Sequence, residues 1–132
     1  NLKVQVVMAS DLPVRDFRSS DPYVKLTLGS AMKKTRVMSD NLNPVWREDL
    51  TFPVKNTDCC LLKVEVWDSD AWGPDDRMGD AEIDLKPLFE KERKQKKLVV
   101  SPCKENCLYR DSIIIQRGDG RRVQEVWLKL RK

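Results

Sequence analysis

Five aspartates in two separated clusters are the residues of this chain with the clearest chemical use. Each cluster falls between stretches in which apolar and polar residues alternate, so both are expected at strand ends. Crowded carboxylates repel one another, and a fold that brings both clusters to one edge needs a multivalent cation. Calcium suits them, because it takes about six to eight oxygen ligands. The clusters are Asp16 and Asp21, then Asp68, Asp70 and Asp76.

Each of these aspartates also has a plain structural interpretation, because aspartate is a common turn former. Paired aspartates serve acid–base catalysis as well, but other catalytic signals are missing. The chain has no histidine, no Gly-x-x-x-x-Gly-Lys phosphate loop and no Gly-x-Ser-x-Gly elbow, and its five glycines are scattered. The sequence therefore predicts a binding protein and no enzyme.

Composition places the chain among ordinary globular domains. Its 132 residues suffice for one domain, 1–132, with 40% apolar and 35% charged residues. A net charge of +4 permits attraction to anionic surfaces without requiring nucleic acid. No apolar run is long enough to span a membrane, and residues 1–6 predict a strand and no secretory signal, so we expect a cytoplasmic protein.

The four cysteines allow two interpretations. A structural zinc ion would need all four thiolates, because histidine is absent, and no Cys-x-x-Cys knuckle is present. Reduced structural thiols are the simpler expectation in a cytosolic protein. The residues are Cys59, Cys60, Cys103 and Cys107.

Strand periodicity covers most of the chain and predicts an all-β, mostly antiparallel sandwich. Residues 86–92 predict one short helix with an early proline. The pattern weakens over 93–120, apart from three consecutive isoleucines, and this stretch is expected to be a long insertion before the last strand. We expect seven strands, at about 2–8, 24–28, 34–38, 46–53, 62–66, 81–85 and 123–130.

Several motifs resemble those of C2 domains over residues 1 to about 90. They are Leu12-Pro13-Val14-Arg15-Asp16, Ser20-Asp21-Pro22-Tyr23-Val24-Lys25, Asn43-Pro44-Val45-Trp46-Arg47-Glu48, Trp67-Asp68-Ser69-Asp70 and Asp76-x-x-Gly79 with Met78. The middle and tail resemble more narrowly the small plant C2 proteins related to abscisic acid signalling and the C2 domains of plant Arf GTPase-activating proteins. No Arf-GAP zinc finger is present.

The resemblance implies an eight-stranded C2 β-sandwich that binds calcium through all five aspartates. Main-chain carbonyls of Arg15 and of Ser69 or Trp67 are implied as further ligands. The metal site would then recruit anionic phospholipid, with lipid phosphate completing the coordination.

Residues beside the implied ligands are candidates for lipid contact. Phe17 and Arg18 flank the first cluster, and Ala71 and Trp72 follow Asp70. Tryptophan favours the membrane interface, although packing between loops is the alternative for Trp72. A basic strand face would bind phosphoinositide headgroups or would simply be solvated; its residues are Lys25, Lys34, Arg36 and Lys63.

Strand order predicts the second C2 topology, because the first strand leads directly into the first aspartate cluster. The fold has eight strands and we count seven, so either the last strand lies beyond this chain or an edge strand comes from elsewhere. An open edge invites a partner strand, and a strand-exchanged or edge-paired dimer is one expectation.

The function predicted from the resemblance is calcium-dependent recruitment of signalling partners to anionic membranes. These partners would be abscisic acid signalling components or small-GTPase regulators. We expect a cytoplasmic protein, peripheral at the plasma membrane, with a nuclear pool as a further expectation. Two alternatives remain: a calcium-independent protein-interaction module that docks through 93–120, and a phosphate-transfer or hydrolytic enzyme that uses the carboxylate-bound metal.

Overall fold

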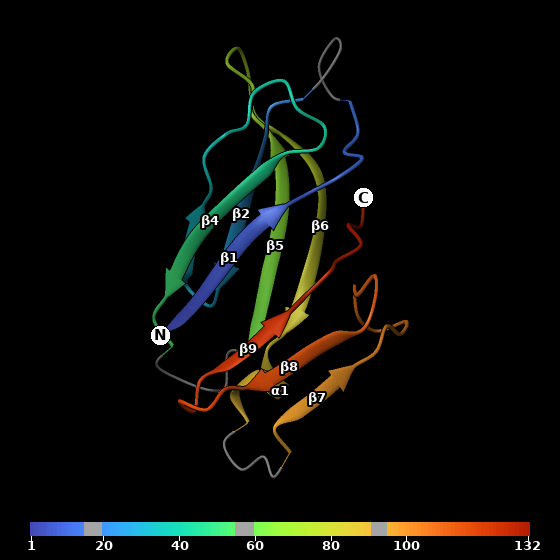
Figure 1. Ribbon diagram of the computed structural model, residues 1–132. Coiled ribbons are helices and arrows are strands. Elements are labelled where there is room, and N and C mark those ends of the chain that lie inside the picture. Colours follow the sequence, from blue (N-terminus) through green and yellow to red (C-terminus); the bar gives the residue numbers. More distant parts are fainter. Residues whose placement is uncertain (15–19, 55–59, 91–94) are drawn as a thin grey trace.

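Antiparallel sheets dominate the computed structural model, which describes residues 1–14, 20–54, 60–90 and 95–132 (Figure 1). The largest sheet has the strand order β3-β2-β5-β6. A pair, β1-β4, and a three-stranded sheet, β7-β8-β9, complete the set, which confirms the all-β prediction. The strands are β1 (Leu2–Met8), β2 (Pro22–Leu28), β3 (Ala31–Lys34), β4 (Val45–Phe52), β5 (Leu61–Asp68), β6 (Asp76–Asp84), β7 (Lys97–Val100), β8 (Ser112–Gln116) and β9 (Arg122–Glu125).

The core lies between the four-stranded sheet and the β1-β4 pair, which crosses in front of β2 and β5 in Figure 1. Alternate residues of β2, β4 and β5 point into it, and Leu26, Phe52 and Leu62 are almost fully buried. Each such side chain stabilises the fold by about 1.5–3 kcal/mol relative to an exposed position. This packing fixes which face of every strand is solvent-facing, and so which charged residues share a surface.

Strand alternation places three loops at the same end of the sheets. β1 runs directly into residues 9–14, as expected for the predicted order, and β2 begins at the same end; the chain returns there at residues 35–44 and again at 69–75. The β2–β3 connection, the end of β4 and the start of β5 lie at the other end, because neighbouring strands are antiparallel. Asp21 of the first predicted cluster therefore shares one end of the sheet with the second cluster, whereas Asp16 lies outside the described residues.

The strand count was wrong: the described residues contain nine strands instead of seven. Two of them, β7 and β8, lie in the stretch 93–120, which we expected to be a long insertion and for which we predicted no strand. Each is only four or five residues long, and the two are separated by an irregular segment, so neither gives a clear periodic signal. They become strands by pairing with each other and with β9.

Two predicted strands also have different bounds. The strand expected over 34–38 is β3, which ends at Lys34, because the Thr35 hydroxyl accepts the Val24 N–H at 2.9 Å in place of a backbone carbonyl. Of the strand expected over 123–130, only the first residues form a regular strand, as part of β9. Beyond Glu125, Leu128 forms an isolated bridge with Leu108, and Arg131 forms one with Asp80.

The predicted helix exists as α1 (Lys86–Phe89), a single turn with Pro87 near its start. Glu90 is extended and ends it. Residues 91–92 of the prediction lie outside the described part of the chain.

Two further expectations concern membrane spans and cysteines. Among the described helices, none has the length and apolar character needed to cross a membrane. Cys103 and Cys107 carry free thiols, and Cys60 packs against the core. Cys59 lies outside the described residues.

Within the described residues β1 pairs only with β4. Leu2, Val4 and Val6 are only partly buried where they pack on the core. An unpaired strand edge accepts other strands readily. The edge-paired or strand-exchanged dimer stays a prediction.

Gly79 of β6 is where the C-terminal segment approaches the sheet. A Cβ there would lie 2.9 Å from Leu130 Cβ and 3.0 Å from the Arg131 carbonyl oxygen, which bonds to the Asp80 N–H at 2.8 Å. We expect Gly79→Ala to lower the free energy of unfolding by about 1–3 kcal/mol, because backbone must shift to admit the methyl group. Urea unfolding measures it. Gly118→Ala is the control, since nothing lies within 4 Å of its Cβ position; equal losses in both variants would contradict the prediction.

Candidate functional site

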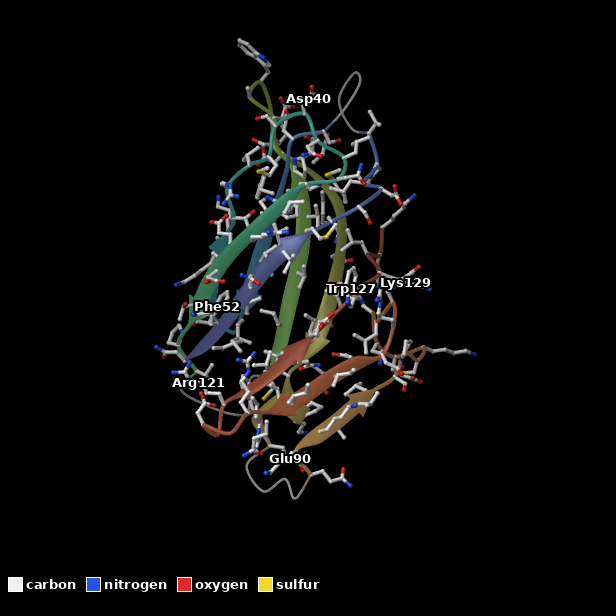
Figure 2. All side chains as sticks on the ribbon, viewed as in Figure 1. Asp40, Phe52, Glu90, Arg121, Trp127 and Lys129 are labelled. Carbon is white, nitrogen blue, oxygen red and sulfur yellow. The ribbon has the colours of Figure 1, made fainter. Side chains whose placement is uncertain are left out.

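Backbone hydrogen bonds hold the three loops together at one end of the molecule. The Ser69 N–H donates to the Asp21 carbonyl at 3.0 Å, and the Asn41 N–H donates to the Ser20 carbonyl at 2.9 Å. Figure 2 labels Asp40 at this end, far from Phe52 at the other end of β4. The loop bases are thus fixed to one another by the backbone before any side chain is considered.

Asp21 and Asp68 are brought together as predicted. Asp68 ends β5 and is 1% exposed, and its carboxylate accepts the Asp21 N–H at 2.8 Å. The Asp21 carboxylate in turn accepts the Asp40 N–H at 2.7 Å. Burying a carboxylate is costly unless donors or cations surround it. This chain of contacts links the first loop, the 35–44 loop and the end of β5.

Asp68 and Asp76 lie directly opposite each other where β5 pairs with β6. Like charges at directly opposite positions of an antiparallel pair destabilise the pairing. A cation between or beside them would relieve this repulsion, so the donor set suits a hard, oxygen-seeking ion such as calcium. The pairing register, which the sequence alone leaves open, creates this opposition.

Asp70 lies two residues beyond Asp68 in the exposed loop 69–75, and its carboxylate accepts the Trp72 N–H at 2.9 Å. No group of three or more acidic or cysteine side chains close enough to hold a metal occurs among the described residues. Two residues of the predicted ligand set, Arg15 and Asp16, lie outside them, as do Phe17 and Arg18 of the predicted lipid contacts.

Trp72 is 97% exposed in the loop 69–75, next to the exposed Ala71. Packing between loops would bury much of the ring, so this exposure argues against that alternative. An indole so fully in water is unusual for a large apolar side chain. The lipid-contact role of both residues stays a prediction.

Three of the four predicted basic residues, Lys25, Lys34 and Lys63, lie on the same face of the four-stranded sheet. Lys25 lies over the Trp67 ring at 4.7 Å from its centroid, and Lys34 lies over the Tyr23 ring at 5.8 Å. We call these four residues the lysine–aromatic face: Tyr23 and Lys25 of β2, Lys34 of β3 and Trp67 of β5. Cation–π contacts of this kind stabilise exposed pairs by about 0.5–1 kcal/mol.

Arg36 is instead engaged with β4. Its guanidinium forms an ion pair with Glu48 at 3.4 Å and donates to the Trp46 carbonyl at 2.7 Å, while the Trp46 indole donates to the Arg36 carbonyl. These contacts brace the edge between the two sheets. Arg36 therefore has a structural role in addition to any part in a basic surface.

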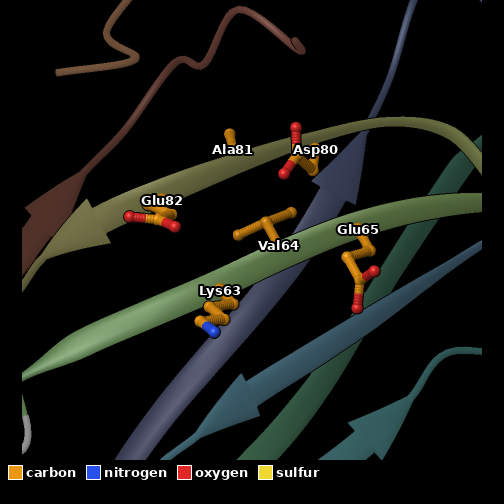
Figure 3. A pocket seen from close by; sticks show the side chains of 6 residues that line it. All are labelled: Lys63, Val64, Glu65, Asp80, Ala81 and Glu82. Atoms are coloured by element: carbon orange, nitrogen blue, oxygen red, sulfur yellow. The ribbon is translucent and has the colours of Figure 1, made fainter. Parts of the chain in front are cut away.

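Lys63 lies in acidic surroundings on β5. Figure 3 shows it beside a hollow on the outer face of β5 and β6 that three carboxylates also line. Two of these, Asp80 and Glu82, form ion pairs with Arg131 at 3.3 and 3.6 Å. The lining residues are Lys63, Val64, Glu65, Asp80, Ala81 and Glu82. This hollow offers little attraction to an anionic ligand.

Asp75 is the residue that the sequence analysis missed. One carboxylate oxygen accepts the Tyr23 hydroxyl at 2.5 Å and the other accepts the Asp70 N–H at 2.9 Å. The hydrogen bond from Tyr23 is the largest cause of the lowered pKa of Asp75; the Asp70 N–H and the charges of Lys34 and Lys25 lower it further. Its position beside Asp76 was the available signal, but only the fold places it against β2.

Tyr23 responds in the opposite direction. Burial is the largest cause that raises the pKa of Tyr23 to about 12, and the hydrogen bond and negative charge of Asp75 add to it, followed by Glu65. The phenol is therefore a hydrogen-bond donor at neutral pH. It fixes Asp75 between the acidic loop and the lysine–aromatic face.

The C2 domain family profile matches residues 1–100, and relatives align over nearly the whole chain, so the protein belongs to the C2 domain family. Among those relatives are C2-DOMAIN ABA-RELATED 11 and 3 of Arabidopsis thaliana, 42% and 43% identical over 98% of this chain and 82% and 81% of theirs. GTPase activating protein 1 of Oryza sativa subsp. japonica is 39% identical over 98% of this chain and 82% of its own. These findings confirm the resemblance that the sequence motifs indicated.

Solved structures give the same fold. A C2 domain of plant extended synaptotagmin 1 aligns with a TM-score of 0.63 and 27% identity, over 96% of this chain and 95% of that one. A calcium-bound pair of C2 domains from extended synaptotagmin 2 aligns with a TM-score of 0.60 over 83% of this chain and 41% of its own, at 24% identity. The protein is thus related to the C2 domains, a family whose members often bind calcium and membranes.

Proposed function

We propose that this protein binds anionic phospholipid membranes in a calcium-dependent manner. The observation that carries the proposal is the buried Asp68 directly opposite Asp76, at the same end as Asp21 and Asp70. These four carboxylates would hold calcium together with Asp16 and with carbonyls of Arg15 and Ser69. When bound, calcium supplies positive charge and coordination positions that lipid phosphate can fill.

Recruitment would operate as an electrostatic switch. Without calcium the clustered carboxylates give the loop end a negative potential that repels anionic lipid. Bound calcium cancels much of this charge. The exposed Trp72 then meets the interface, while Lys25 and Lys34 face the headgroups. Attraction of this kind weakens as salt rises, because the Debye length is only about 8 Å at physiological ionic strength.

The wider role follows from the relatives and forms part of the proposal. Residues 1–132 would act as one C2 domain without catalytic activity, with 93–120 as an addition specific to its subfamily. It would bring abscisic acid signalling components or small-GTPase regulators to the membrane, in keeping with the names of relatives. The site of action would be the cytoplasmic face of the plasma membrane, with a nuclear pool as a further expectation.

Co-sedimentation with phosphatidylserine vesicles tests the proposal. We expect the wild-type protein to sediment in calcium and to remain in solution in EDTA. Trp72→Ala is expected to bind vesicles about tenfold more weakly, since the indole no longer enters the interface. Its calcium affinity without lipid, measured by calorimetry, should be unchanged, because the indole itself would contact lipid and no metal.

Tyr109→Ala is the matched control, because Tyr109 is also an exposed aromatic, 61% exposed, but lies between β7 and β8. It should bind as the wild type does. Sedimentation that is equal with calcium and with EDTA would refute calcium dependence. If Trp72→Ala binds vesicles as strongly as the wild type does, membrane attachment depends on calcium and the lysines and not on Trp72.

The second candidate function is calcium-independent protein binding through the β7-β8-β9 sheet. One observation favours it: Val99 lies opposite Ile113 and Ile115 opposite Val123, and all four are exposed on one face. Exposed apolar surface often marks an interaction site. A protein whose stability and vesicle binding both ignore calcium would favour this candidate.

A further inference from the structure

We propose that Asp75 is an internal competitor of phosphate at the lysine–aromatic face, and that it makes headgroup binding there depend on calcium. The inference rests on the proposed function, and it assigns a specificity-determining role to a residue outside the predicted ligand set. The ligand of the face would be a phosphate-bearing lipid headgroup.

The contacts of Asp75 place a negative charge at this face. Its carboxylate is held by Tyr23 at 2.5 Å, and Tyr23 lies beneath Lys34. The hydrogen bond from Tyr23 lowers the pKa of Asp75 most, and the positive charges of Lys34 and Lys25 lower it further. The two lysines that would bind phosphate are therefore already close to an anion supplied by the protein.

Carboxylates offset part of the positive charge of the face. Lys25 and Lys34 contribute two positive charges, whereas Asp75 contributes one negative charge and Glu65, directly opposite Lys25 on β5, contributes another. Lys63, two residues before Glu65 on β5, and Arg77, opposite Trp67, border the face with further positive charge, so the two carboxylates weaken the attraction for phosphate without abolishing it. Like-charge repulsion from Asp75 opposes an arriving phosphate at short range. In the calcium-free protein the face should be a weak phosphate site in spite of its lysines.

Asp75 also belongs to the acidic loop. Its second oxygen accepts the Asp70 N–H at 2.9 Å, and it adjoins Asp76 in the chain. Asp70 and Asp76 are both proposed calcium ligands. Calcium held by them would attract the Asp75 carboxylate and offset its repulsion of phosphate. Calcium and phosphate would thus strengthen each other's binding, and this coupling is reciprocal by thermodynamic necessity.

The Trp67 indole is a further feature of the face. The Trp67 indole N–H is buried and has no hydrogen-bond partner among the described residues. Buried donors are nearly always paired in folded proteins. The side chains of the lysine–aromatic face therefore do not satisfy all of their own hydrogen-bond donors. The indole of Trp46, by contrast, donates to the Arg36 carbonyl.

The test measures binding of soluble inositol trisphosphate by calorimetry, in EDTA and in calcium, for wild type and Asp75→Asn. Asparagine keeps an acceptor for the Asp70 N–H and removes the charge. We expect Asp75→Asn to bind about fivefold tighter than wild type in EDTA, a gain that shrinks at high salt. We also expect calcium to strengthen binding less than it does in the wild type.

Asp119→Asn is the matched control, because it changes the net charge equally at the exposed turn before β9, where Asp119 pairs with Arg121. It should leave the affinity unchanged. Tyr23→Phe keeps the charge but releases the carboxylate, and should give a smaller gain in the same direction. If neither Asp75→Asn nor Tyr23→Phe binds more tightly in EDTA, the inference is overturned.

A second experiment, with vesicles, distinguishes binding of lipid headgroups from binding of free phosphates. Asp75→Asn should sediment in EDTA with neutral vesicles that carry a phosphoinositide, and a gain confined to the soluble probe would overturn the lipid assignment. Failure of the proposed function looks different: the wild type would then bind vesicles equally with and without calcium. In either case, the affinities of Asp75→Asn and Tyr23→Phe for inositol trisphosphate in EDTA, compared with that of the wild type, decide the role of Asp75.

Discussion

Replacing Asp70 with asparagine is expected to abolish calcium-dependent vesicle binding while the fold stays intact. Asp70 is exposed, and its hydrogen bond from the Trp72 N–H can be kept by the amide oxygen of asparagine. The charge is lost, and calcium depends on carboxylate ligands for its affinity. Asp21→Asn should behave in the same way and keep its hydrogen bond from the Asp40 N–H. Sedimentation and calcium calorimetry measure both variants.

The control is Asp84→Asn, an exposed aspartate at the opposite end of β6 whose hydrogen bond to the Lys86 N–H asparagine also preserves. It removes the same charge away from the loops and should bind as the wild type does. Wild-type calcium affinity in Asp70→Asn would contradict the assignment. An equal loss in Asp84→Asn would point to net charge instead of ligation.

Calcium is expected to stabilise the folded protein substantially. The ions bind the assembled loops and hardly the unfolded chain, so stability rises by mass action. At a hundredfold excess over the dissociation constant the gain is about 2.7 kcal/mol per independent site. This gain in the free energy of unfolding already includes the relief of the repulsion between Asp68 and Asp76. Thermal unfolding in EDTA and in increasing calcium measures the effect.

Asp70→Asn provides the internal comparison, because its melting temperature should respond much less to calcium than that of the wild type. In EDTA it should be no less stable, since one of several repelling carboxylates is gone. A wild-type melting temperature that ignores millimolar calcium would count against a functional metal site and in favour of the calcium-independent candidate.

Much of the fold was predictable because its signals are local. Alternation of apolar residues identified β1, β2, β5 and β6, and turn-forming residues separated them. Antiparallel alternation then placed Asp21 at the same end as Asp68, Asp70 and Asp76. The motifs of the first 90 residues also identified the family correctly.

The sheet β7-β8-β9 was not predictable in this way. Its strands are short and are stabilised by partners that lie 10 or more residues away in the chain, as Ile114 does in pairing with Leu98 and Gln124. Such pairings depend on tertiary contacts more than on local propensity. The weak pattern over 93–120 therefore gave no prediction of β7 and β8.

For the candidate site, the sequence by itself determined which residue types were available: clustered carboxylates, an adjacent tryptophan and scattered lysines. Only the tertiary structure decided which of them meet. The register of β5 on β6 sets Asp68 against Asp76, and the β2–β5 pairing sets Lys25 beside Trp67. The tertiary structure also places Arg36 against β4 and lets the Tyr23 hydroxyl donate to Asp75. Register and sheet packing are long-range properties, fixed by burial of the common core, and no local pattern in the chain encodes them.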